Sequence, residues 1–177
     1  MINTLLAYDD QDSELGAFFE SCGKEVIDFI DNLKEEDWNT VDLNSKSLNS
    51  LNVELQTGNF KNNFVFASFS FCFACSAGVD LGPDLIAKGT LGFIGYSDEV
   101  WVVPIYPAFS SCAVAGLFSF YDGATIKQAF EFGKNKYLIE VDILYKIDFV
   151  AAANLSEIRD SLVFLGDGDL SIKEFDN

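Results

Sequence analysis

Apolar residues along the chain follow two spacings, which predict a succession of strands and helices. The segment Leu15–Leu33 has apolar residues at steps of three and four, the pattern of an amphipathic helix. Short apolar runs at Ile2–Tyr8 and Thr90–Tyr96 predict buried strands. A short helix is expected around Pro83, and further helices from Ser110 as far as residue 166. Strands that alternate with helices in the first half predict an α/β fold with a mostly parallel central sheet and helices on both faces.

The run Phe64–Cys75 is too long for one ordinary strand, although both of its alternating faces are apolar or small. A single strand of this length would extend about 40 Å at roughly 3.3 Å per residue. Division after Ser70 gives two strands of normal size, but two adjacent parallel strands need a crossover of about a dozen residues or more. The pattern therefore predicts that a loop is missing between Ser70 and Phe71.

Composition and charge restrict the partners of the chain. The chain is 49% hydrophobic with 18 Phe, so we expect a folded core. No linker or repeat divides residues 1–177, so we expect one domain. The formal net charge is −17 with only 11 Lys and Arg. Nucleic-acid binding depends on clustered cations, so we expect no nucleic-acid partner, and an anionic membrane surface is disfavoured for the same reason.

Two apolar stretches raise the question of a membrane span, but neither has the pattern of one. Serines interrupt the stretch 64–79, and Pro104 and Pro107 break the stretch 100–121, which has no basic flank. No signal peptide is recognisable at the start of the chain. In a chain without a signal peptide we expect the four cysteines to be free thiols in a reducing compartment, so we expect a cytoplasmic protein.

Cys72 and Cys75 form a C-x-x-C pair, which could indicate a metal or redox site. The chain has no His and no second close cysteine pair, so a tetrahedral zinc site would lack ligands. A redox pair needs a turn rather than the interior of a strand. We expect no metal and no cofactor.

The segment "FACSAGVDLGPDLIAKGTLGFIGYSDEVW", residues 73–101, resembles the caspase-like cysteine peptidases, including gingipain-type and CHAT-domain relatives. The resemblance implies a three-layer caspase-like fold and a peptide or protein substrate. It places Cys75 at the position of the nucleophile and Ser97, Asp98 and Trp101 along the substrate groove. Asp98 would suit a basic side chain at P1, the substrate residue before the cleaved bond. Small bacterial members of such families are often found with defence effectors, so the resemblance also implies a protein effector, cleaved or bound, as a partner.

The chain departs from this family at the catalytic base, because it contains no His. A Cys–His pair needs the His to activate the thiol and to protonate the leaving amine. Three hypotheses follow. The chain is a cysteine endopeptidase with nucleophile Cys75 whose His lies in a segment missing from this sequence. Alternatively, it is an inactive pseudoprotease that acts as a binding or regulatory subunit, or an unrelated small α/β binding protein.

Overall fold

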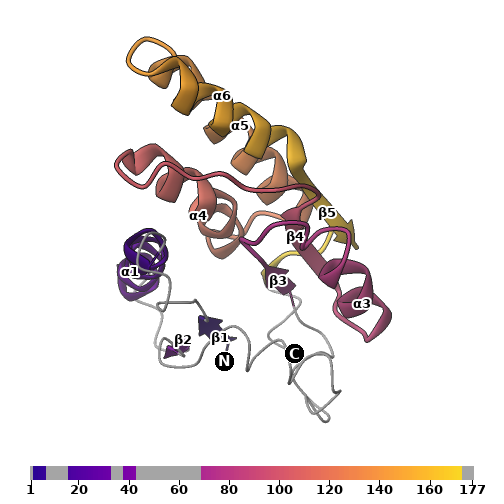
Figure 1. The fold of residues 1–177 in the computed structure, drawn as a ribbon. Helices are drawn as coiled ribbons and strands as arrows, with labels where there is room; N and C mark the ends of the chain where they lie inside the picture. Colours follow the sequence, from indigo (N-terminus) through magenta and orange to yellow (C-terminus); the bar gives the residue numbers. More distant parts are fainter. Residues whose placement is uncertain (1, 7–15, 33–37, 43–68, 173–177) are drawn as a thin grey trace.

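The structure, a computed structural model, describes residues 2–6, 16–32, 38–42 and 69–172. In these residues the chain forms a mixed α/β fold with five helices and two small sheets (Figure 1). The strands are β1 (Ile2–Leu6), β2 (Trp38–Asp42), β3 (Phe69–Phe71), β4 (Gly92–Tyr96) and β5 (Leu162–Gly166). The helices are α1 (Gly16–Asn32), α3 (Leu81–Ala87), α4 (Pro107–Tyr121), α5 (Ile126–Leu144) and α6 (Phe149–Ser161).

The described strands form a two-stranded and a three-stranded sheet. β1 and β2 pair in parallel, and β3 pairs in parallel with β4. β5 pairs with the other edge of β4 in the antiparallel direction. The α/β class is confirmed, but the larger described sheet is a mixed sheet of three strands rather than a mostly parallel central sheet.

Most of the predicted elements in the described part of the chain form where the periodicity placed them. The amphipathic pattern of Leu15–Leu33 becomes α1, and every residue of β4 is buried. Pro83 lies in the first turn of α3, and Gly89, with a φ of 101°, follows the end of that helix. α5 begins with a capping box, in which the Thr125 hydroxyl accepts the Gln128 N–H and the Gln128 side chain accepts the Thr125 N–H.

The expectation that the chain stays helical to residue 166 is wrong. α6 ends at Ser161, and Leu162–Gly166 form β5, in register with Tyr96–Gly92 of β4. A short apolar run that directly follows a helix has no periodicity of its own, so the free edge of β4 decides its conformation.

The division of the long apolar run after Ser70 is also wrong. β3 passes through Ser70 and Phe71 without a break, and its three residues pair in register with Gly92–Ile94 of β4. A single strand crosses this junction, so the chain needs no crossover there, and the structural reason for a missing loop disappears. Residues 64–68 of the run, and the polar segment before them, lie outside the described residues.

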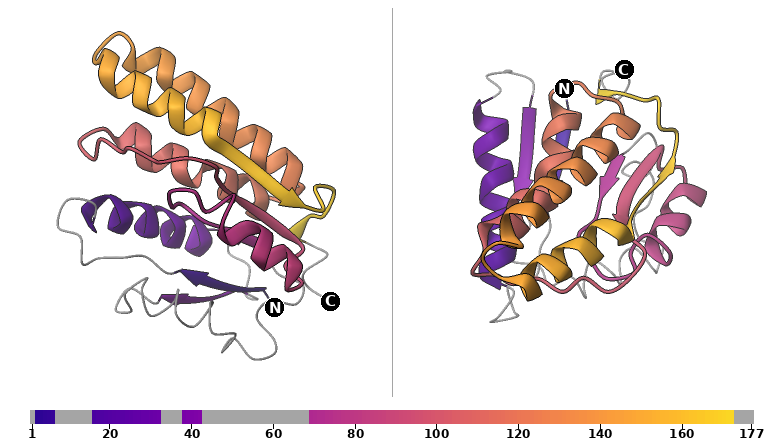
Figure 2. Two further views of the ribbon diagram at one scale, coloured as in Figure 1. Left: turned by 45° about the vertical axis from the view of Figure 1, so that its right-hand side comes forward. Right: turned by 90° about the horizontal axis from the view of Figure 1, so that it is seen from above.

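The helices stack in layers around α4, as Figure 1 and the left panel of Figure 2 show. α5 and α6 lie side by side on one side of α4, and α1 packs on the other. α3 packs against β4 and β5. Among the described residues, no helix combines the length and the apolar character that a membrane span requires.

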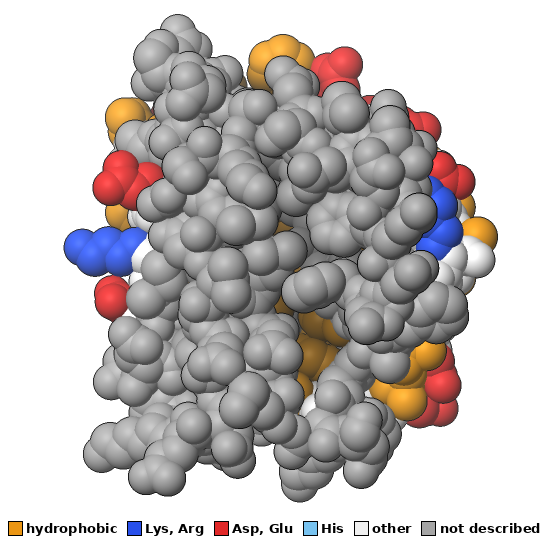
Figure 3. Space-filling model, turned by 90° about the horizontal axis from the view of Figure 1, so that it is seen from below, with side chains coloured by type: hydrophobic (Ala, Val, Ile, Leu, Met, Phe, Trp, Pro, Cys, Tyr) orange, Lys and Arg blue, Asp and Glu red, His pale blue; other side chains and the backbone are white. Residues whose placement is uncertain are grey.

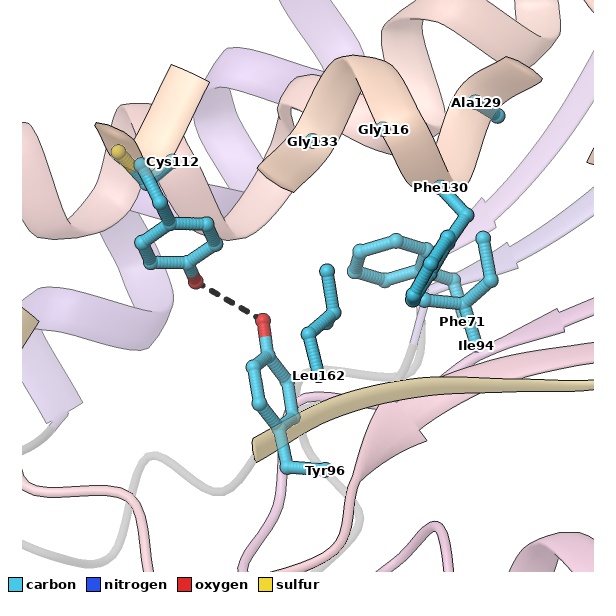
Figure 4. A pocket seen from close by; sticks show the side chains of 10 residues that line it. Phe71, Ile94, Tyr96, Cys112, Gly116, Ala129, Phe130, Gly133 and Leu162 are labelled. Atoms are coloured by element: carbon cyan, nitrogen blue, oxygen red, sulfur yellow. Dashed lines mark hydrogen bonds between the residues drawn. The ribbon is translucent and has the colours of Figure 1, made fainter. Parts of the chain in front are cut away.

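The core is centred on the contact between β4, α4 and α5. Gly116 of α4 lets this helix approach α5 closely, because a Cβ on Gly116 would lie 3.0 Å from the Ala129 carbonyl oxygen (Figure 4). Beside them, the buried hydroxyl groups of Tyr96 and Tyr137 form a hydrogen bond of 2.9 Å. The space that Figure 4 shows is closed and holds no room even for a water molecule. It is part of the packed core rather than a ligand site.

Candidate active site

Cys75 lies in a turn that follows β3. The β3–β4 ladder continues for one residue beyond the strand, where the Cys72 N–H donates to the Ile94 carbonyl at 2.9 Å. The chain then leaves the sheet, and the Cys75 side chain is exposed. The next residue, Ser76, has a φ of 56°. This left-handed conformation costs roughly 1–2 kcal/mol for a residue other than glycine, so surrounding contacts must hold the turn in place.

Three hydrogen bonds fix this turn against the segment that follows β4. The Ser76 N–H donates to the Asp98 carbonyl at 3.0 Å, and the Gly78 N–H donates to the Tyr96 carbonyl at 2.7 Å. The Val100 N–H donates to the Cys75 Sγ at 3.3 Å. The thiol is therefore exposed to solvent but held in one place.

Gly78 is required by the close contact between this turn and the sheet. A Cβ at this position would overlap the Val163 side chain of β5 and would lie 3.1 Å from the backbone of Tyr96. The C-S-A-G sequence thus has a structural role at its glycine as well as a candidate chemical role at Cys75.

A cleft of about 390 Å³ opens beside the segment that follows β4. Its lining residues come from this segment and from the last turn of α6: Ser97, Asp98, Glu99, Trp101, Glu157, Asp160 and Ser161. Val100, which binds the Cys75 sulfur, lies between two of these lining residues in the chain. The cleft and the thiol are therefore neighbours.

The structure brings the three residues predicted to line a substrate groove into this one cleft. Ser97 is held by two bonds to the Ser161 carbonyl, one of 2.8 Å from its N–H and one of 3.0 Å from its hydroxyl. Asp98 accepts the Glu99 N–H at 2.8 Å, and Trp101 exposes 61% of its surface. Cys75 does not line the cleft itself but lies next to it.

Sequence reasoning missed the contribution of α6, namely Glu157, Asp160 and Ser161. These residues are about 60 positions away from Ser97 in the chain. The antiparallel pairing of Tyr96 with Leu162 places the end of α6 beside the end of β4. Only the recognition of β5 as a strand could have predicted this neighbourhood.

The cleft is strongly acidic, with four carboxylates among its seven lining residues. One of them, Asp160, is paired with Arg159 at 2.8 Å, and this hydrogen bond keeps the pKa of the Asp160 carboxyl below its usual value. No three Asp, Glu or Cys side chains in the described residues converge as metal ligands would. Carboxylates distributed along a cleft, with an exposed indole, suit an extended cationic side chain.

The other three cysteines differ sharply from Cys75 in exposure. Burial raises the thiol pKa of Cys72 to about 11 and that of Cys22 and Cys112 to about 12. Cys112 is buried and Cys22 and Cys72 are half-buried, and near neutral pH all three thiols are protonated, so they are poor nucleophiles. A reagent that alkylates thiols under native conditions should therefore react at Cys75.

Amide hydrolysis also needs a proton donor for the leaving amine, and the sequence offers no His for this task. The arrangement can hold a peptide beside a nucleophilic sulfur. Comparisons of the chain with protein-family models, with curated proteins and with solved structures found no match. The functional argument therefore depends on the geometry of the site itself.

Proposed function

We propose that this protein is a caspase-like cysteine endopeptidase in which Cys75 is the nucleophile. The observation that carries the proposal is an exposed thiol, held by the Val100 N–H beside a cleft that contains Ser97, Asp98 and Trp101. The position of Cys75, in a turn between β3 and α3, also supports a three-layer caspase-like arrangement as the finer description of the fold. Free thiols at all four cysteines fit a reducing compartment such as the cytoplasm.

In the proposed reaction, the Cys75 sulfur attacks the carbonyl carbon of a peptide bond. The C–N bond breaks, the amine leaves with a proton, and water then hydrolyses the thioester to return the thiol. General acid–base assistance is worth about 10²–10⁴-fold in such steps. A chain without His should therefore cleave peptides slowly unless a base reaches the site from outside these 177 residues.

We propose a peptide with a basic side chain as the substrate class. The cleft has four carboxylates, and its exposed Trp101 could stack on a cationic group. A Lys or Arg side chain at P1 would place its charge among the carboxylates while its carbonyl carbon lies near Cys75.

Alkylation with peptidyl chloromethyl ketones tests this proposal. We expect a probe with Lys at P1 to label Cys75 faster than a matched probe with norleucine, whose side chain has the same unbranched carbon skeleton but no ammonium group. Cys75→Ala should abolish labelling, and the isosteric variants Asp98→Asn and Glu157→Gln should reduce the preference for Lys. Equal labelling of the Cys75→Ala variant would disprove the role of Cys75, and equal rates for the two probes would disprove the basic preference.

The second candidate is an inactive relative that binds peptides or a protein effector through the same cleft. The absence of His from the sequence favours it. Turnover of a fluorogenic Lys peptide, abolished by Cys75→Ala, identifies the enzyme. Binding of the same peptide without turnover, measured by fluorescence anisotropy, identifies the binding protein. If the peptide does not bind and the probe does not label the protein, both candidates fail, and an unrelated α/β binding protein remains as the third hypothesis.

A further inference from the structure

Large exposed apolar side chains are concentrated at one place on the molecule. Of the eleven found in the described residues, eight lie between residues 132 and 150. The remaining three, Val79, Trp101 and Ile105, lie in the segments around the candidate active site. A concentration of this kind marks an interaction surface, whereas single exposed apolar residues need no explanation.

Three of these side chains form a stripe on one side of α5. Phe132, Ile139 and Ile143 follow one another at steps of seven and four residues, so they lie on the same side of the helix. Their surfaces are 45–56% exposed. The buried residues of α5, such as Gly133 and Tyr137, belong to another side, which packs on α4 and β5.

The stripe continues into the turn between α5 and α6. The apolar residues of this turn and of the first turn of α6, which are 62–68% exposed, are Tyr145, Ile147, Phe149 and Val150. The rings of Tyr145 and Phe149 contact each other edge to face, with 5.4 Å between their centroids. We call the stripe and these four residues together the α5 surface. Figures 1 and 2 show α5 and α6 as the outermost layer of the described fold.

The charge of α5 separates it from the rest of the chain. Residues 126–150, which span the α5 surface, hold four basic residues (Lys127, Lys134, Lys136 and Lys146) and four acidic residues (Glu131, Glu140, Asp142 and Asp148). This segment therefore has no net charge in a chain of −17. On the face shown in Figure 3, described acidic side chains lie around the edge of the molecule. The α5 surface is thus an apolar area with balanced charge on a strongly acidic protein.

This charge balance restricts what could cover the α5 surface. An anionic membrane would find no excess of basic residues on the α5 surface to bind, and a highly charged partner would find little opposite charge there. A second copy would bring the same apolar surface and the same balanced charge, so the contact itself would carry no repulsion. The seven side chains expose on the order of 700 Å², close to the ~800 Å² that each partner contributes to a standard interface.

We propose that the α5 surface is the interface of a homodimer, in which α5 and the α5–α6 turn of one copy pack against the same elements of a second copy. The candidate active site stays open in this arrangement. Glu157 and Asp160 lie eight and eleven residues after Phe149. At about 1.5 Å per residue they are roughly 12–16 Å along α6 from the turn.

Sedimentation equilibrium of the full chain tests the proposal. We expect a species of twice 19.6 kDa at micromolar concentrations. Ile139→Lys and Ile143→Lys should each weaken the dimer by about tenfold or more, because they place a charge inside an apolar contact. Since both positions are about half exposed, circular dichroism and urea unfolding should show an intact fold. Val79→Lys, at a position 55% exposed outside the α5 surface, is the matched control and should leave the dimer unchanged.

Three results would overturn the proposal. The first is a wild-type chain that stays monomeric up to hundreds of micromolar. The second is a dimer that survives both α5 variants, which would place the interface elsewhere. The third is a monomer that co-sediments with phosphatidylcholine vesicles, which would identify a lipid surface as the occupant.

Discussion

β4 and the five residues that follow it differ completely in environment, although they are contiguous in the chain. Every residue of Gly92–Tyr96 is buried between helices and neighbouring strands. In the segment that follows, Ser97, Asp98, Glu99 and Trp101 line an acidic cleft, and the Val100 N–H supports the Cys75 turn. The comparison shows that the strand provides stability and the segment after it provides chemistry. This is the usual division between a rigid scaffold and the loops that it positions.

The largest expected difference in stability is between variants of two aromatic residues, one in β4 and one in the segment that follows it. Phe93→Ala should lower the free energy of unfolding by about 3–5 kcal/mol, because the ring is fully buried and its removal leaves a cavity. Trp101→Ala should change it by no more than about 0.5 kcal/mol, since this ring is mostly exposed. Urea unfolding measures both, and similar losses for the two variants would contradict the comparison.

A buried polar pair offers a second test of the core. Tyr137→Phe or Tyr96→Phe should each cost about 1–3 kcal/mol, because each variant leaves one buried hydroxyl group without its partner. The double variant should cost less than the sum of the two, since it removes both polar groups. A double-mutant cycle by urea unfolding measures this coupling, and additive losses would show that the hydrogen bond contributes nothing.

The close contact of α4 and α5 predicts opposite effects for two glycines. Gly116→Ala should cost about 1 kcal/mol or more, because the new methyl group would press on the Ala129 carbonyl oxygen. Gly133→Ala should be neutral or stabilising, since the nearest atom to its added Cβ lies 3.6 Å away and alanine favours a helix. Thermal unfolding of the two variants decides the matter, and a larger loss for Gly133→Ala would contradict this packing.

The smallest effect appears only in alkaline solution. Burial raises the thiol pKa of Cys72 from 9.0 to about 11 and that of Cys112 from 9.0 to about 12. Below pH 9 these thiols are protonated in both the folded and the unfolded chain. Between pH 9 and 11–12 the unfolded chain loses protons that the folded chain keeps, so the free energy of unfolding should fall as the pH rises.

Urea midpoints at pH 7, 9 and 10.5 measure this pH dependence. Cys112→Ala should make the free energy of unfolding fall less steeply with pH, because the variant lacks the one proton that Cys112 retains in the folded chain. Trp101→Ala should leave this slope unchanged. A midpoint that stays constant from pH 8 to 11 would show that these thiols are accessible to water.

The sequence predicted the helices better than the strands. The three- and four-residue steps of α1 and the Pro83 and Gly89 signals of α3 depend on neighbours in the chain, so local chemistry decides them. β5 and the continuity of β3 depend on pairing with β4, which is distant in the chain. A strand edge can impose a conformation on a short apolar run that has no clear period of its own.

The sequence by itself determined the α/β class and the core position of β4, because each depends on a local pattern of apolar and polar residues. The grouping of Ser97, Asp98 and Trp101 was an expectation from the resemblance of residues 73–101 to a family, and no local pattern of apolar and polar residues predicted it. Tertiary structure alone decided that the end of α6 completes the cleft and that the Val100 N–H holds the Cys75 sulfur. Both result from strand pairing between segments far apart in the chain. Local periodicity does not predict such pairing. It is established only in the tertiary structure, where β3 and β5 pair with the two edges of β4.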